Sequence, residues 1–363
     1  MNFNVDFAKA PLLVIWEITR ACALACRHCR ASAEDIRHPG ELSLEEGYRL
    51  IDQVAAMGTP LMIFTGGDPF QRDDLEDLIR HGKKAGLRVG TIPATTHRLT
   101  RERMASVQAA GVDQIAVSID GATSQTHDDF RKVQGSFEKA IQGAAWAKEL
   151  GIPLQVNTVL GAWNADEFDE MAALVTRLGI VFWEVFFLVP TGRGTELKGC
   201  NAVQMRRLFE RMVDMSKSVP FVIKITEGSQ HRAFMAMQRQ REGHQAAGVA
   251  QGHAPGRHHQ LGLSAATVNA GRGFCFVDHL GNICPSGFLP LVRGNVRTND
   301  LAEVYRTDKV FLELRDSSLL KGRCGACRYR DTCTGGSRAR GFAATGDYLA
   351  SDPLCILHPN ESI

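Results

Sequence analysis

Three cysteines near the start of the chain have a spacing that can hold an iron–sulfur cluster. Cys22, Cys26 and Cys29 form a C-x3-C-x2-C run directly after an apolar segment. Three thiolates at this spacing can bind three irons of a [4Fe-4S] cluster and leave the fourth iron without a protein ligand. A bound metal with an open coordination position can do chemistry, whereas a fully ligated metal is usually structural. The run therefore predicts a catalytic cluster.

Two other interpretations of this run are a zinc knuckle and three unrelated buried thiols. Zinc would need a fourth Cys or His close by. His28 lies between two of the cysteines and is badly placed to serve as that ligand. The residues therefore favour the cluster.

The cysteine run resembles that of the radical SAM enzymes. In that family the open iron chelates S-adenosylmethionine (SAM), and an injected electron cleaves SAM to a 5′-deoxyadenosyl radical that abstracts hydrogen from the substrate. The resemblance implies SAM as cofactor and an external one-electron donor such as flavodoxin or ferredoxin. It also implies that His28, which stands where the family has an aromatic residue, lies near the adenine.

A second motif, Gly66-Gly67-Asp68-Pro69, follows one strand–helix unit later. Two glycines let the backbone approach a ligand closely, and a carboxylate beside them can receive an ammonium group. In this position the motif resembles the Gly-Gly-Glu sequence that binds the amino group of SAM in the family. Asp68 is shorter than Glu, so either its carboxylate or only the backbone makes that contact.

A third group of polar residues lies on the fourth and fifth expected strands. Alternation puts Ser118 and Asp120 on one face, where they resemble the family's ribose and carboxylate contacts. Asn157 matches a polar position near the ribose. Arg131 resembles the arginine that pairs with the methionine carboxylate, and a solvated charge is an equal alternative for it. The turn at 190–194 is expected at the same rim. It either helps to form the SAM or substrate pocket or is a plain barrel turn.

A second set of cysteines lies near the C-terminus. Cys324, Cys327, Cys333 and Cys355 supply four thiolates, which can saturate a zinc ion or a [4Fe-4S] cluster. Spacing alone does not choose between the two metals. The set resembles the SPASM extension of radical SAM enzymes, and this resemblance implies at least one auxiliary [4Fe-4S] cluster.

The chain departs from the full seven-cysteine SPASM pattern in two ways. Ser337 stands where the C-x3-C partner of Cys333 would be, and only Cys275 and Cys284 precede the set. Two cysteines do not complete a site that needs four thiolates. This pair therefore stays an uncertain candidate for a second auxiliary cluster, and Cys200 is interpreted as a plain thiol.

The elements that must position these residues alternate regularly between strands and helices. Ser43 and Glu46 form a capping box before a helical pattern, and a glycine follows each expected helix, at 58, 86, 111, 151 and 179. Alternation of this kind requires parallel strands with right-handed crossovers. We expect an α/β fold with a partial (β/α)6 TIM-like barrel, as the resemblance also implies, with strands at Leu12–Trp16, Leu61–Thr65, Val89–Ile92, Ile115–Ile119, Leu154–Val159 and Val181–Val189.

Changes in composition divide the chain into four parts. We expect an N-terminal tail (1–10), the radical SAM partial barrel (11–227), a mobile connector or insertion (228–272) and a small SPASM-type (twitch-type) iron–sulfur domain (273–363). A helix at 203–215 and a strand at 221–225 close the barrel region. The histidines at 244–259 could bind a metal, but a surface insertion is the favoured interpretation.

Composition limits the partners and the compartment. The chain has 363 residues, 44% of them hydrophobic and 23% charged, with a formal net charge of +2. These values are ordinary for a globular protein and do not favour nucleic acid as a partner. No secretory signal or spanning segment is evident, so we expect no membrane association. Ten cysteines in such a chain indicate reduced thiols and metal in the cytoplasm.

The substrate is suggested only by resemblance. The run from Cys324 to Cys333 continues into 335–340 and 345–348, and it looks most like the branch that modifies tetrapyrrole side chains in alternative haem and haem d-type biosynthesis. The arginines between 321 and 340 could attract acidic groups or simply offset the cluster's charge. Radical modification of a ribosomally made peptide is the alternative. An electron carrier and a zinc-stapled scaffold are the hypotheses from other classes.

Overall fold

The computed structural model describes residues 4–241, 261 and 266–357. The histidines at 244–259 lie outside the described residues. No helix among the described residues is both long and apolar enough to cross a bilayer.

One ten-stranded sheet organises the chain, in the order β10-β9-β8-β1-β2-β3-β4-β5-β6-β7. The strands from β1 to β7 pair in parallel, each with its neighbour in sequence. Their bounds are Leu13–Thr19 (β1), Leu61–Gly66 (β2), Arg88–Thr91 (β3), Gln114–Ser118 (β4), Leu154–Leu160 (β5), Phe182–Phe187 (β6) and Val222–Thr226 (β7). The predicted partial barrel is confirmed, and each expected strand is within a few residues of its predicted place.

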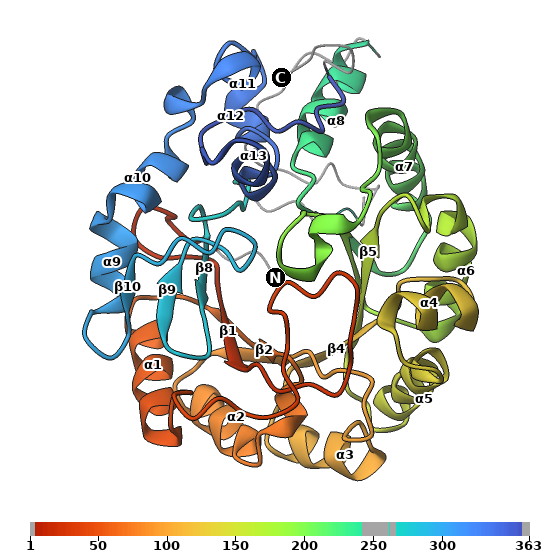
Figure 1. Ribbon diagram of the computed structural model, residues 1–363, viewed down its shortest axis with the longest axis vertical. Coiled ribbons are helices and arrows are strands. Elements are labelled where there is room, and N and C mark those ends of the chain that lie inside the picture. Colours follow the sequence, from red (N-terminus) through yellow and green to blue (C-terminus); the bar gives the residue numbers. More distant parts are fainter. Residues whose placement is uncertain (1–3, 242–260, 262–265, 358–363) are drawn as a thin grey trace.

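Helices follow the strands and surround the sheet on its outer side (Figure 1). The first begins at the capping box of Ser43 and Glu46, as expected. The glycines at 58, 86, 111, 151 and 179 all have positive φ, which stops each helix without strain. The helices are Leu44–Ala56 (α1), Leu75–Lys84 (α2), Arg101–Ala109 (α3), Ser124–Arg131 (α4), Ser136–Glu149 (α5), Phe168–Leu178 (α6) and Ala202–Met215 (α7).

The two faces of the sheet have different chemistry. Trp16 and Phe64 point outward and are fully buried, and a Cβ on Gly47 of α1 would lie 2.7 Å from the Trp16 ring. The inner face carries a polar row. Ser118 pairs in register with Asn157, and the row continues through residues 184 and 224. Parallel neighbours in register point the same way, so this row faces the inside of the barrel.

The first part of the C-terminal segment joins the barrel sheet. Strand β8 (Phe274–Val277) pairs in parallel with β1, and β9 (Asn282–Cys284) and β10 (Gly294–Asn295) follow in antiparallel order. The remaining helices are Leu301–Thr307 (α9), Lys309–Arg315 (α10), Gly322–Gly325 (α11), Arg330–Cys333 (α12) and Arg338–Thr345 (α13). Figure 1 shows α11, α12 and α13 at one end of the molecule, beside α8 (Gln230–Arg241).

Helix α8 (Gln230–Arg241) lies in the stretch for which the sequence indicated only a connector. Its sequence has little helical apolar periodicity, because polar and basic residues dominate it. Ala233, Phe234 and Met235 are nevertheless buried. Packing against neighbouring elements, rather than an amphipathic pattern, therefore accounts for this helix.

Candidate active site

The cysteine run forms a loop at the carboxyl end of β1. Cys22 and Cys26 are buried and Cys29 is half-buried. The loop is closed by two backbone hydrogen bonds, from the Cys22 N–H to the Glu34 oxygen (2.8 Å) and from the Arg27 N–H to the Phe130 oxygen (3.0 Å). Side chains at the carboxyl ends of parallel strands are where chemistry occurs in such folds.

Each of the three thiol sulfurs accepts a hydrogen bond from an N–H group. The backbone N–H of Leu24 lies 3.4 Å from Cys22 Sγ, that of Ala33 lies 3.4 Å from Cys29 Sγ, and Arg131 Nη1 lies 3.6 Å from Cys26 Sγ. Hydrogen bonds to the ligand sulfurs are a known way in which proteins tune iron–sulfur clusters. The donor set therefore fits three thiolate ligands. Within the described parts of the chain, no three His, Cys, Asp or Glu side chains form a site for a single metal ion.

Burial controls the protonation of these thiols. It raises the pKa of Cys22 to about 12, with a smaller opposing effect from the Leu24 N–H. Burial also raises the pKa of Cys26, although Arg131 favours its thiolate. Binding of metal must therefore displace protons from both sulfurs.

The two glycines of the second motif allow β2 to approach the cysteine loop. A Cβ on Gly66 would lie 2.3 Å from the Thr19 carbonyl oxygen, and one on Gly67 would lie 2.5 Å from that of Ala21. The Gly67 N–H donates to the Thr19 oxygen over 2.8 Å, and the Asp68 N–H to the Ala21 oxygen over 2.7 Å. Any side chain at either glycine would separate the two loops.

Asp68 is fully buried, and its carboxylate is occupied by protein donors. Oδ1 accepts from the N–H groups of Phe70 (3.1 Å) and Ala94 (3.2 Å), and Oδ2 accepts from Thr96 Oγ1 (2.6 Å). Burial raises the pKa of Asp68, and these donors oppose the shift. The carboxylate thus ties the end of β2 to the loop after β3.

Asp120 and Arg131 form a buried ion pair. Arg131 Nε donates to Asp120 Oδ2 over 2.7 Å, and Arg131 Nη2 donates to the same oxygen. Asp120 Oδ1 accepts from the Val159 N–H over 2.8 Å. Burial alone would raise the pKa of Asp120, but Arg131 holds it below its usual range. The pair links β4 to the cysteine loop, because Arg131 also donates to Cys26.

The remaining residues of the expected SAM site lie around the same rim. Ser118 and Asn157 are side by side on β4 and β5, and Asn157 Oδ1 accepts from Gln155 Nε2 over 2.6 Å. Pro69 begins a short 3₁₀ turn, Pro69–Gln71 (η1), whose N-cap is Asp68.

His28 belongs to a stack of three rings that the sequence did not reveal. The His28 and Phe130 ring centroids are 4.5 Å apart, and those of Phe130 and Trp163 are 4.4 Å apart. Burial lowers the pKa of His28 to about 3, so its ring is neutral at ordinary pH. A Cβ on Gly161 would lie 1.9 Å from the Trp163 ring. Glycine at this position leaves room for the Trp163 ring, but a single glycine in the sequence does not indicate such a stack.

The four C-terminal cysteines line one pocket. Cys324, Cys333 and Cys355 are buried and Cys327 is half-buried. The Tyr329 N–H lies 3.4 Å from Cys327 Sγ, and the Gly336 N–H lies 3.2 Å from Cys333 Sγ. The remaining lining residues are Gln230, Arg323, Arg330, Gly335, Gly336, Asp352 and Leu357. The structure thus brings together the full predicted set of thiols.

Ser337 is occupied by other partners. Its hydroxyl donates to the Glu227 carboxylate at the end of β7 and accepts from the Arg340 N–H (3.0 Å), which caps α13. Its backbone N–H donates to Asp352 Oδ2 over 2.8 Å. The position that would carry a further cysteine in the full pattern is therefore part of a hydrogen-bonded core.

Cys275 and Cys284 point to opposite faces of the sheet. Cys275 pairs in register with Val14 and belongs to the outer core. Phe276, the next residue, pairs with Cys284 across β8 and β9. Since successive residues alternate and paired residues share a face, Cys284 lies on the inner side. The structure does not bring these two thiols into one ligand set.

Two arginines of the C-terminal segment are structural. Arg338 and Arg340 are buried. Arg338 Nη1 donates to the Tyr348 (3.0 Å) and Ala350 (2.8 Å) oxygens, and Arg340 forms an ion pair with Asp352 (2.8 Å). These two side chains are therefore not available to attract an acidic substrate.

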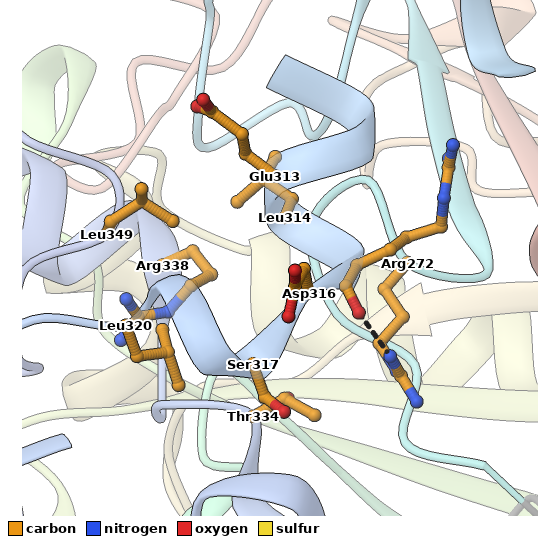
Figure 2. A pocket seen from close by; sticks show the side chains of 10 residues that line it. Arg272, Glu313, Leu314, Asp316, Ser317, Leu320, Thr334, Arg338 and Leu349 are labelled. Carbon is orange, nitrogen blue, oxygen red and sulfur yellow. Dashed lines mark hydrogen bonds between the residues drawn. The ribbon is translucent and has the colours of Figure 1, made fainter. Parts of the chain in front are cut away.

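A second pocket lies between α10 and the segment from Thr334 to Arg338 (Figure 2). Arg272 Nη1 donates to the Arg315 oxygen at its edge over 2.8 Å. None of its lining residues is a cysteine. This pocket is therefore separate from both thiol sets.

Comparisons with known proteins identify the family of the chain. The family model "Radical SAM superfamily" matches residues 16–175. The AdoMet-dependent heme synthase of Methanosarcina barkeri (strain Fusaro) is 37% identical over 98% of this chain and 99% of its own length. The pre-heme d1 synthase of Dinoroseobacter shibae is 29% identical, over 96% of this chain and 87% of its own.

The fold has solved counterparts as well. The crystal structure of Streptococcus suis SuiB bound to precursor peptide SuiA superposes with a TM-score of 0.69 and 17% identity, over 95% of this chain and 75% of that one. At this identity the likeness concerns the fold alone. With a matching family model and a near full-length relative above one-third identity, the chain belongs to the radical SAM superfamily.

Proposed function

We propose that this radical SAM enzyme abstracts hydrogen from a carboxylate-bearing side chain of a tetrapyrrole. The observation that carries the chemistry is the loop of Cys22, Cys26 and Cys29, in which every sulfur accepts an N–H donor. The substrate class is supported by near full-length similarity to proteins named heme synthase and pre-heme d1 synthase.

The three cysteines would hold the catalytic [4Fe-4S] cluster and leave one iron for SAM. When bound, the cluster supplies the electron that cleaves SAM to a 5′-deoxyadenosyl radical. The chain's own contribution is orientation. Gly66 and Gly67 bring the β2 loop against the cysteine loop. The rings of His28, Phe130 and Trp163 stack beside it, with Phe130 buried and the other two half-buried.

The polar inner row supports cofactor binding beside the cluster. Ser118 and Asn157 lie in register on adjacent strands and would face the ribose. Asp120 is engaged with Arg131, so its role would be to hold Arg131 against Cys26 rather than to contact the cofactor directly. Asp68 would act in the same indirect way, through the loop that it ties to β3.

An auxiliary [4Fe-4S] cluster would occupy the second thiol set. Cys324, Cys327, Cys333 and Cys355 line one pocket and supply the four thiolates that such a cluster needs. A cluster at this place could bind the substrate or carry an electron away. An external one-electron donor such as flavodoxin or ferredoxin would reduce the catalytic cluster, and the reaction would take place in the cytoplasm.

Radical modification of a peptide is the second candidate. It is favoured by the fold shared with SuiB, which was crystallised with the precursor peptide SuiA. Against it stands the higher sequence similarity to the tetrapyrrole-related proteins, which extends over nearly the whole chain.

Product analysis tests the proposal. Reconstituted protein is incubated anaerobically with SAM, dithionite and either iron coproporphyrin or a candidate peptide. We expect 5′-deoxyadenosine together with a porphyrin that has lost carboxyl groups. The variant with Cys22, Cys26 and Cys29 all changed to Ala is the matched control and should form neither product. A modified peptide with an unmodified porphyrin would replace the first candidate by the second.

A further inference from the structure

The turn after β6 lies directly on the cysteine loop. It forms a 3₁₀ segment, Gly192–Glu196 (η3), and the Arg193 N–H donates to the Cys29 oxygen over 3.0 Å. Gly192 has a φ of +55°, and a Cβ there would lie 2.4 Å from the Arg30 carbonyl oxygen. Only glycine therefore allows this close approach.

The Arg193 side chain spans the loop. Nε donates to the Cys26 oxygen over 3.0 Å, and Nη1 donates to the Ala33 oxygen over 3.3 Å. Together with the backbone contact to Cys29, these bonds fix the loop at three points. Arg193 therefore clamps the segment that carries the second and third cysteines.

One nitrogen of this guanidinium remains. Arg193 Nη2 is buried and has no hydrogen-bond partner among the described residues. Buried N–H groups without an acceptor are rare and unfavourable, so each calls for an explanation. An acceptor that binds next to the loop would provide one.

The shape of the guanidinium gives the direction of this donor. Nε and Nη2 lie on the same edge of the planar group. In Arg297 the same two atoms take both carboxylate oxygens of Glu46, over 2.6 and 2.9 Å. Because Nε of Arg193 points to the Cys26 oxygen, Nη2 faces the same side of the cysteine loop.

The other arginine whose side chain contacts Cys26 uses its corresponding edge differently. Nε and Nη2 of Arg131 both donate to Asp120, and only Nη1 reaches Cys26 Sγ. Arg20 Nε and His28 Nδ1 also lack a partner among the described residues, but of the two arginines whose side chains contact Cys26 only Arg193 has unused N–H groups. They are charge-assisted donors, which form the stronger class of hydrogen bond.

We propose that Arg193 is a positioning residue of the catalytic cluster, with Nη2 donating a hydrogen bond to a cluster sulfur while Nε and Nη1 clamp the loop. This inference rests on the proposed function, because it requires a cluster at Cys22, Cys26 and Cys29. Hydrogen bonds to cluster sulfur stabilise the reduced state and raise the reduction potential. Arg193 therefore makes the cluster easier to reduce.

The test is a redox titration of fully reconstituted protein, followed by electron paramagnetic resonance without SAM. The signal of the catalytic cluster is identified as the one that changes when SAM is added. We expect Arg193→Gln to shift its midpoint potential to more negative values and to alter its spectrum, and Arg193→Lys to recover part of the shift. Arg315→Gln is the matched control. Arg315 also donates to a backbone oxygen (Tyr305, 2.9 Å), but both residues are far from the cysteine loop along the chain.

The outcomes are distinct. Wild-type potential and spectrum in Arg193→Gln with full iron content would overturn the inference. If Arg193→Gln loses iron, the Arg193→Lys protein decides in the same way. A change in SAM affinity at unchanged potential would also overturn it, because Nη2 would then serve SAM instead. A wild-type protein without any SAM-sensitive signal would instead refute the proposed function.

Discussion

At the scale of single residues, the side chains around the cysteine loop are held by partners from other elements of the fold. Cys22, Cys26 and Cys29 could be grouped from their spacing, because they are close along the chain and lie on one loop. Asp68 and Asp120 could be placed at the rim, but their partners come from other elements, such as Thr96 and Arg131. Contacts of this kind depend on packing, which no local pattern encodes.

Asp68 gives a prediction at this scale. Asp68→Ala removes the acceptor of three protein donors, so we expect a loss of about 1–3 kcal/mol in stability together with weaker SAM binding. In Asp68→Asn the remaining oxygen still accepts from the two N–H groups, and the new amide can donate to Thr96. SAM affinity should therefore stay close to the wild-type value in Asp68→Asn and fall roughly ten- to a hundred-fold in Asp68→Ala.

Isothermal titration with SAM and thermal melts of both variants check this expectation. If Asp68→Asn loses as much affinity as Asp68→Ala while it melts like the wild type, the negative charge itself acts on SAM. The indirect role given to Asp68 would then be wrong.

At the scale of elements, strands and helix ends were predictable and α8 was not. The barrel strands are continuous apolar runs, and glycines end the helices between them. Both signals can be recognised from neighbouring residues in the sequence. Helix α8 has no such local pattern. Its stability depends on neighbours such as Phe209 of α7, whose ring centroid lies 6.2 Å from that of Phe234. The ring stack beside His28 was missed for the same reason.

His231 in α8 makes the stability of the protein depend on pH. Burial lowers its pKa to about 4, and its Nδ1 lies 2.8 Å from the Gly228 oxygen. In the unfolded chain its pKa is about 6.5, so the unfolded state binds the proton first as pH falls. The stabilisation by the neutral ring is complete above pH 6.5 and is lost between that value and about 4.

We therefore expect acidification to destabilise the wild type more than His231→Gln. Between pH 7 and pH 5 the difference should be about 2 kcal/mol, seen as a larger drop in melting temperature. The other buried histidines, such as His127, contribute equally to both proteins and cancel. Parallel melting curves against pH in the two proteins would contradict this role of His231.

At the scale of the whole molecule, the C-terminal segment is fastened to the barrel next to the cysteine loop. Strand β8 continues the sheet beside β1. The buried carboxylate of Glu17 accepts a hydrogen bond of 2.6 Å from Arg30, the residue after the third cysteine. The same carboxylate lies 3.1 Å from Nδ1 of His279 in the C-terminal segment. Composition indicated where this segment starts, but shared strands are long-range pairings that composition does not encode.

This arrangement leads to a prediction about the number of clusters. The four C-terminal thiols line one pocket, whereas Cys275 and Cys284 point to opposite faces and Ser337 is engaged with Glu227. We expect the wild type to hold about eight irons, as two four-iron clusters. The double variant with Cys275 and Cys284 changed to Ala should keep that number.

The matched variant has Cys324, Cys327 and Cys333 changed to Ala. It should lose about four irons and melt earlier, because metal binding to these thiols contributes folding energy. Its cleavage of SAM should persist, since the N-terminal loop is intact. Iron and sulfide counting with paramagnetic resonance measures both outcomes. Loss of iron in the Cys275 and Cys284 variant, with a changed spectrum, would instead require a second auxiliary cluster with a ligand other than cysteine, and a fold around β8 and β9 that differs from this structure.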